Sequence, residues 1–247
     1  MSDTGSPYAD TRDMYAVHAV FRREFALLPG LVRAVEPGDA DRAQIVTDHI
    51  KLLIFFLHAH HSSEDAVLWP RLLTRAPREI DPVVRLAEGH HEGIETLSVE
   101  VDKLLHTWSG SAASDNAEAL AEELEQLVVV LCEHMDLEEK LVLPLVERHI
   151  FATEWEKMVE GGVASIPPEV IPVMAGMLMY EGGEESLPPE VRAVLADAAP
   201  QAYAAYAECV HGTPAPARSS DVVFGRPLVA VVATVDQMWL GTPGMEP

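Results

Sequence analysis

Cysteine and basic residues are scarce in this sequence of 247 residues. Its two cysteines, Cys132 and Cys209, form no metal-binding or redox motif, so we expect a reduced, cytoplasmic setting. Lysine and arginine number 17 against 40 aspartates and glutamates, which gives a formal net charge of −23. An acidic surface of this size repels nucleic-acid phosphates and anionic membranes alike, and we expect neither as a partner.

Long apolar runs are also missing. The longest, such as residues 52–57 and 127–132, are far short of the roughly 20 residues that a membrane span needs. The first ten residues have neither the basic start nor the apolar segment of a secretory signal peptide. Hydrophobic residues nevertheless make up 48% of the chain, which excludes general disorder and predicts a soluble protein with a substantial core.

Histidine, in contrast, is abundant and unevenly placed. The chain has 11 histidines, of which only His211 lies beyond residue 150. Over residues 10–150 apolar positions recur at steps of three and four, as in amphipathic helices. Four helices are predicted, because breakers occur at Pro37-Gly38, Ala76-Pro77 and Ser109-Gly110-Ser111. We expect an all-α, up-down four-helix bundle, with the second helix capped by Asp39 and the fourth beginning at Asp115.

Two of these helices have apolar stripes that lead to a histidine. In the second helix the stripe consists of Ile45, Leu52, Leu53 and Phe56, and it reaches His60. In the fourth helix it consists of Leu120, Leu124, Leu127 and Leu131, and it reaches His134. Both histidines are therefore expected to face the interior of the bundle.

The rest of the chain has a different character. Residues 151–212 are predicted to form a helical extension of two or three short helices that ends near His211 and packs on the bundle, closing its open end. The segments 165–170 and 186–191 are near repeats with a Pro-Pro-Glu core, which is typical of helix starts. Residues 213–247 are predicted to be a linker followed by an apolar tail, in which 227–239 is either a strand or a docked segment.

A His-x-x-x-Glu motif occurs twice, once from His60 to Glu64 and once from His134 to Glu138, each followed six residues later by a proline that we expect to end the helix. Residues four apart project from the same face of a helix, so each motif directs an imidazole and a carboxylate at one point. The first and third helices each contribute a histidine followed three residues later by a core hydrophobe. The predicted inward set is His18, His60, Glu64, His91, His134 and Glu138.

This combination of side chains suits a pair of metal ions. Imidazole binds iron, copper or zinc, and a carboxylate can bridge two cations through its two oxygens. If two octahedral ions offer roughly twelve positions, four imidazoles, two bridging carboxylates and one oxo or hydroxo bridge leave about two positions open. Two glutamates buried without cations would cost several kcal/mol each, so the cations also explain why Glu64 and Glu138 can face inward.

On these residues the chain resembles the hemerythrin-like, or His-His-Glu (HHE) cation-binding, family over about residues 10–150. The resemblance implies a four-helix bundle with a non-haem di-iron centre, bound by the six residues above and bridged by an oxo or hydroxo group. It differs from the oxygen-carrying hemerythrins in the third helix, where those proteins have two histidines four residues apart, whereas Ala87 and Glu95 flank His91 at that distance. His61 or His90, each adjacent to a predicted ligand, is a candidate for a fifth nitrogen.

The leading functional hypothesis is a di-iron protein that binds dioxygen, peroxide or nitric oxide, in sensing or handling of these ligands. The unfilled positions weaken plain oxygen carriage and favour a sensing or peroxide-related role. One alternative is a catalase-like enzyme that consumes peroxide. Another is a protein-interaction module that responds to iron or oxygen through the extension. The sequence leaves open whether the protein is an enzyme.

Overall fold

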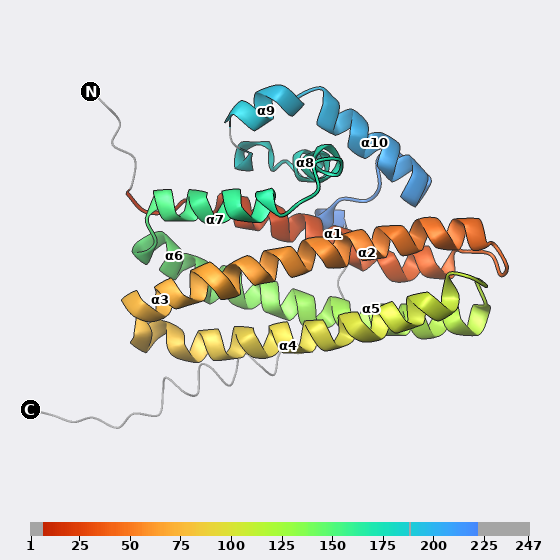
Figure 1. Ribbon diagram of the computed structural model, residues 1–247, viewed down its shortest axis with the longest axis horizontal. Helices are drawn as coiled ribbons and strands as arrows, with labels where there is room; N and C mark the ends of the chain where they lie inside the picture. The colour runs from red at the N-terminus through yellow and green to blue at the C-terminus, as the bar shows by residue number, and fades with distance from the viewer. Residues whose placement is uncertain (1–6, 188, 222–247) are drawn as a thin grey trace, which may run out of the picture.

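Four long helices form an antiparallel bundle in the computed structural model, which describes residues 7–187 and 189–221 (Figure 1). They are α1 (Arg12–Arg33), α2 (Ala40–Ser63), α4 (Pro77–Trp108) and α5 (Ser114–Leu137). α1 packs against α2 and α5, and α4 packs against the same two helices, so the four surround one core. Within the described ranges the only β-pairing is an isolated bridge between Tyr8 and Phe151, and the predicted all-α bundle is confirmed.

Two of the long helices continue through a widened turn instead of ending. α2 leads into the π-helical segment η1 (Glu64–Leu68) and then α3 (Trp69–Arg75). α5 likewise leads into η2 (Glu138–Val142) and α6 (Leu143–His149). The prediction that Pro70 and Pro144 end these helices is therefore wrong. Each proline lies in the first turn of the next helix, where its missing N–H is tolerated because the π turn has already interrupted the regular ladder.

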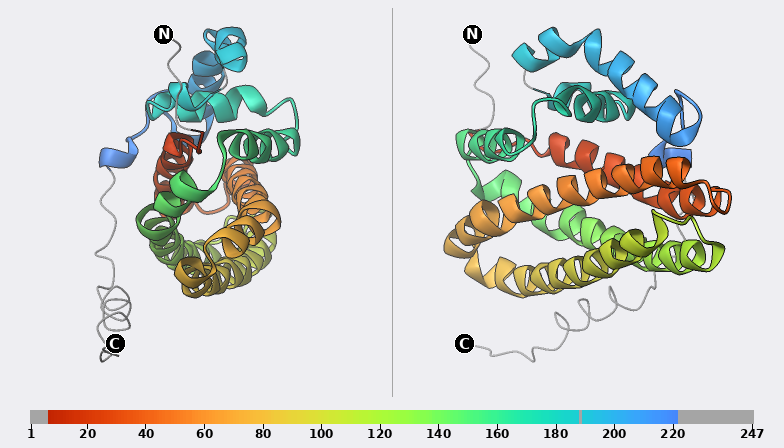
Figure 2. Two further views of the ribbon diagram at one scale, coloured as in Figure 1. Left: turned by 90° about the vertical axis from the view of Figure 1, so that its left-hand side faces the viewer. Right: turned by 45° about the vertical axis from the view of Figure 1, so that its right-hand side comes forward.

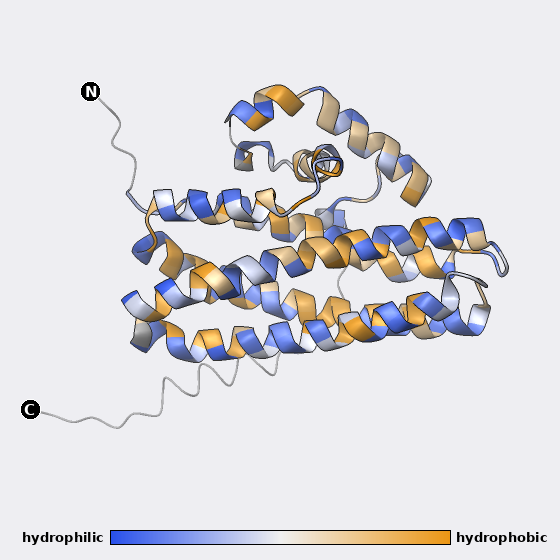
Figure 3. Cartoon of the chain, in the orientation of Figure 1, coloured by the Kyte–Doolittle hydropathy of each residue, from blue (hydrophilic) through white to orange (hydrophobic). Residues whose placement is uncertain are grey.

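The predicted helix starts and buried faces agree with the structure, except that the buried face of α2 is rotated relative to the predicted one. Asp39 caps α2 as expected, accepting a hydrogen bond from the backbone N–H of Arg42 at 2.9 Å. α5 begins at Ser114, one residue before Asp115, and its predicted leucine stripe is buried. In α2 the fully buried stripe is instead Val46, Ile50, Leu53 and Leu57, whereas Ile45 and Leu52 are only partly buried. Polar and apolar stretches alternate along each long helix, as one buried face requires (Figure 3).

The extension contains more helices than expected and covers the side of the bundle. Its helices are α7 (Ala152–Ala164), α8 (Ile171–Tyr180), α9 (Pro189–Leu195) and α10 (Ala198–His211), with short 3₁₀ turns η3 (Glu184–Ser186) and η4 (Ser219–Asp221). α7, α8 and α10 lie against α1 and α2 and not across an end of the bundle (Figure 2). Of the two repeats, the second includes the start of α9, and the first precedes α8. The predicted apolar tail lies outside the described residues.

Candidate metal centre

A polar layer interrupts the hydrophobic core of the bundle. One apolar cluster fills the end near the α1–α2 turn, and a second fills the end formed by α3, α6 and the start of α4. Between the two clusters, each of the four long helices contributes a buried histidine to the polar layer: His18 on α1, His61 on α2, His91 on α4 and His134 on α5. The charged residues Glu64 and Glu138 lie in the same layer, each about 1% exposed.

The layer contains two groups of possible metal ligands. His61, Glu64, His91 and His134 form one group, and His18, His60 and Glu138 form the other, with the ligand atoms of each group within 4.8 Å of one another. All six residues of the inward set predicted from the sequence thus meet here. His61 joins them, whereas the structure places the other candidate, His90, in neither group.

Both carboxylates lie between the two groups. Oε1 of Glu64 is 3.3 Å from Nε2 of His60, and its Oε2 is 3.6 Å from Nε2 of His91. Oε2 of Glu138 is 3.3 Å from Nε2 of His18 and 3.3 Å from Nε2 of His134. Each glutamate therefore faces histidines of both groups. Glu64 does so with its two oxygens, as a carboxylate that bridges two cations would, and Glu138 does so with Oε2.

Buried polar atoms without partners show that the site fits a pair of cations. None of the four oxygens of Glu64 and Glu138 makes a well-formed hydrogen bond with the described residues, and the same holds for Nε2 of His18, His60 and His61. Burial, and next the charge of Glu138, raises the pKa of Glu64 well above its usual range. Leaving such groups unpaired in the core costs several kcal/mol, and positive ions between them would remove that cost.

Burial keeps several imidazoles of the centre in their neutral form. Burial lowers the pKa of His60 to about 3 and that of His134 to about 4, and it holds the pKa of His61 well below its usual range. His18 differs: burial lowers its pKa, but the facing carboxylates of Glu138 and Glu139 outweigh burial and raise it overall. Neutral imidazole is the metal-binding form, so most of the set is already in the state that a cation needs.

Two further acids orient histidines from outside the centre. Asp65 Oδ1 lies 2.9 Å from Nδ1 of His91 and also accepts a hydrogen bond from the Trp69 indole at 3.0 Å. Glu139 Oε1 lies 2.9 Å from Nδ1 of His18 and is held by Arg22 at 2.5 Å. An acceptor at Nδ1 fixes the tautomer and turns the Nε2 lone pair toward the centre.

Comparison with known protein families matches residues 9–146 to the hemerythrin HHE cation-binding domain. The chain belongs to this family. No curated protein and no solved structure matches it. The hemerythrin-like domain is therefore a metal-binding helical domain, for which iron is the typical metal. Among the described residues, no helix combines the length and apolar character needed to cross a bilayer.

The remaining candidates lie outside the hemerythrin-like centre. The ring of His90 is 6.0 Å from that of His134, and His90 is only partly buried. Tyr15 is 44% exposed, and its hydroxyl faces the backbone oxygen of Glu139 at 3.4 Å, so it belongs neither to the core nor to the centre. His58 and His106 are exposed.

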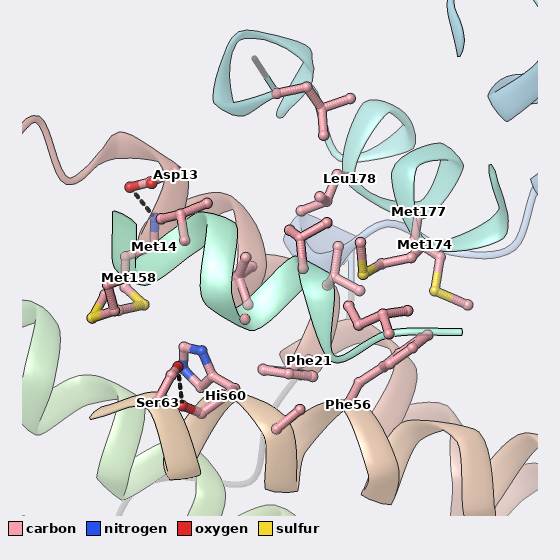
Figure 4. Close-up of a pocket in the computed structure, with 18 of the residues that line it drawn as sticks. Asp13, Met14, Phe21, Phe56, His60, Ser63, Met158, Met174, Met177 and Leu178 are labelled. Atoms are coloured by element: carbon pink, nitrogen blue, oxygen red, sulfur yellow. Dashed lines mark hydrogen bonds between the residues drawn. The ribbon is translucent and has the colours of Figure 1, made fainter. Parts of the chain in front are cut away.

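An apolar cavity of about 180 Å³ lies between the hemerythrin-like bundle and the extension. Its wall includes Met14 and Phe21 from α1, His60 from α2, Met158 from α7 and Met177 from α8 (Figure 4). His60 is the residue of the centre that lines it, so this imidazole separates the cavity from the two glutamates. The extension, which the family match does not cover, therefore supplies about half of the residues that line this cavity beside the centre.

Proposed function

We propose that this protein holds two iron ions in the polar layer and binds a small uncharged ligand there, dioxygen or nitric oxide, for sensing or handling it. One ion would be bound by His61, His91 and His134, and the other by His18 and His60. Glu64 and Glu138 would bridge the two. The position of each buried carboxylate between histidines of both groups is the observation that supports this proposal. Bound iron would supply a redox-active centre at which such a ligand can coordinate.

The number of histidines favours binding of one small ligand. Two octahedral ions offer roughly twelve coordination positions, of which two bridging carboxylates and one oxo or hydroxo bridge fill about six. Four imidazoles then leave about two positions open, and five imidazoles leave about one. His61 supplies the additional nitrogen. A single open position suits a diatomic ligand. It also weakens the preference for peroxide chemistry, which depends on two open positions.

The cavity supports the choice of an apolar ligand over peroxide. Its wall is largely formed by methionine, valine, leucine and phenylalanine side chains. Dioxygen and nitric oxide lose little on transfer from water into such a space, whereas peroxide would leave hydrogen bonds behind. We therefore place the catalase-like enzyme second. A response of the extension to ligand binding stays a separate prediction, for which the shared wall of the cavity gives a physical route.

A titration of the reduced, iron-loaded protein with nitric oxide tests the proposal. We expect saturable visible absorbance changes at about one ligand per pair of irons. Glu64→Ala should lose the response together with the iron, while the exposed control His106→Ala should keep both. An iron-loaded protein that shows no spectral change with either nitric oxide or dioxygen would refute ligand binding. Rapid oxygen release from added peroxide, abolished in Glu64→Ala, would establish the enzyme instead.

A further inference from the structure

A third cluster of metal-ligating side chains lies away from the di-iron centre. It consists of Glu24 on α1, His49 on α2 and His211 on α10, and its ligand atoms lie within 4.8 Å of one another. His49 precedes His60 by eleven residues on the same helix, which is about 16 Å along the axis. The side chains of Glu24 and His49 are fully buried and that of His211 is 4% exposed. None of the three belongs to the residues predicted from the sequence to bind metal.

One carboxylate oxygen of Glu24 accepts hydrogen bonds from other residues, and the second oxygen faces the two histidines. Oε1 accepts hydrogen bonds from Nη2 of Arg23 at 2.6 Å and from the hydroxyl of Tyr203 at 3.0 Å. Oε2 lies 3.2 Å from Nε2 of His211 and 3.4 Å from Nε2 of His49. In a tetrahedral zinc site with bonds of 2.0–2.1 Å, neighbouring ligand atoms are about 3.3 Å apart. The spacing around Oε2 is therefore that of the edges of such a site.

His49 resembles His18 and His91 in having a polar partner at Nδ1. Nδ1 of His49 lies 2.8 Å from the hydroxyl of Tyr206, which leaves Nε2 directed at Glu24. This Nε2 is buried and makes no well-formed hydrogen bond with the described residues. Burial lowers the pKa of His49, and in the tautomer whose Nδ1–H donates to Tyr206 the neutral ring turns the Nε2 lone pair toward Glu24. For Glu24, burial is outweighed by the neighbouring His211 and His49, which hold its pKa well below the usual range and keep it ionised.

The surrounding charges leave room for a cation. Arg23 is the neighbouring positive charge, and it also pairs with Glu181 through Nη1 at 2.5 Å. Glu24, Glu181 and Arg23 together carry one net negative charge, which a divalent ion would overcompensate by only one unit. Arg42 holds the end of α10 by donating hydrogen bonds to the carbonyl oxygens of Cys209, at 2.6 Å, and Val210. These hydrogen bonds fix the C-terminal end of α10 and thereby the position of His211 beside Glu24 and His49.

We propose that Glu24, His49 and His211 bind a single divalent transition-metal ion, with zinc as the best match. Two imidazoles and one carboxylate are a common zinc ligand set, in which a water molecule completes the tetrahedron. Because α10 supplies one ligand and α1 and α2 supply the others, the ion fastens the extension to the bundle. The wall of the cavity formed by α8 then depends on this ion, since α8 packs against α10.

Zinc stoichiometry of the full-length protein tests this site independently of the proposed function. After chelation, titration with Zn²⁺ and removal of unbound metal, His211→Gln should retain one zinc ion fewer per chain than the wild type. The exposed control His106→Gln should match the wild type, whatever amount of zinc the di-iron centre also takes up. The melting temperature should rise with zinc in the wild type by more than in His211→Gln.

A milder variant covers the case in which His211→Gln does not fold. Tyr206→Phe removes only the hydroxyl that faces His49, and we expect the zinc affinity to fall by about 10- to 100-fold. Anomalous diffraction at the zinc edge should place the ion between Glu24 and the two histidines. Equal zinc content in the wild type and folded His211→Gln, or an unchanged affinity in Tyr206→Phe, would overturn the proposal and leave the cluster as a buried hydrogen-bonded ion pair.

Discussion

Oδ1 of Asp65 lies 2.9 Å from Nδ1 of His91, and this contact is repeated across the centre between Glu139 and His18 at the same distance. In both cases the acid directly follows a buried glutamate of the centre in the chain and faces a histidine on a different helix. Each His-x-x-x-Glu motif therefore supplies two candidate ligands together with the acid that contacts a third. This explains how four separate helices can present their imidazoles in one common geometry.

Removing this contact should weaken metal binding without removing a ligand. For Asp65→Ala we expect iron affinity to fall by about 10- to 100-fold, because the His91 ring loses its fixed tautomer and orientation. Competition with a chelator measures the change. Asp102→Ala, an exposed aspartate on the same helix as His91, is the matched control and should bind iron like the wild type. Equal affinities in all three proteins would show that Asp65 does not position His91.

The pKa of Glu64 predicts opposite effects of one substitution in the metal-free and iron-loaded protein. Since burial and the charge of Glu138 raise this pKa, its contribution to stability is present below the unfolded value and is lost as the pH rises. Metal-free Glu64→Gln should therefore melt higher than the metal-free wild type at about pH 7.5, with a smaller difference at about pH 5. With iron the order should reverse, because the amide does not bridge two cations. A metal-free variant that melts lower at the higher pH would contradict this.

Filling the cavity should slow the ligand and leave the iron in place. Val17 lines the cavity and is partly buried, so Val17→Phe puts a ring into the space beside His60. We expect association of nitric oxide with the iron-loaded protein, followed by stopped-flow absorbance, to become several-fold slower at unchanged iron content. Val129→Phe makes the same change on α5, where Val129 is 48% exposed, and should leave the rate unchanged. Equal rates in both variants would mean that the ligand enters by another path.

Two glycines test how tightly the extension is packed. A Cβ on Gly176 of α8 would collide with the carbonyl oxygen of Ala199 and with Tyr203 on α10, whereas a Cβ on Gly161 of α7 meets nothing within 4 Å. Gly176→Ala should therefore lower the free energy of unfolding by about 1–3 kcal/mol. Gly161→Ala should be neutral or stabilising by up to about 1 kcal/mol. Denaturant unfolding measures both, and a harmless Gly176→Ala would show that α8 and α10 pack more loosely.

Helical periodicity accounts for most of what the sequence could reveal. The doubled motif and the stripe on α5 predict that His134 and Glu138 face the interior, and both side chains are buried there, because residues three or four apart must share a helix face. The predicted stripe of α2 combines the partly buried Ile45 and Leu52 with the buried Leu53 and Phe56, and it leads to His60. His61 is a candidate from the sequence only because it adjoins a predicted ligand. The buried positions Leu53 and Leu57 lead by steps of four to His61, so periodicity could have selected it over His90.

Other features depend on contacts that no local pattern encodes. The prolines after each motif read as helix ends, because a π turn that carries the helix past them has no sequence signature of its own. Glu24 and His211 are separated by most of the chain, and only the packing of α10 on α1 and α2 brings them together. The cavity likewise exists because the extension covers the side of the bundle, which the composition of residues 151–212 could not specify.

Anomalous diffraction at the iron edge from crystals of the iron-loaded protein tests the central claim most directly. The account predicts two iron peaks per chain within about 4 Å of each other, one beside His61, His91 and His134 and the other beside His18 and His60. Both carboxylates should contact both peaks. A single iron, or two irons with Glu64 and Glu138 each bound to only one of them, would contradict it.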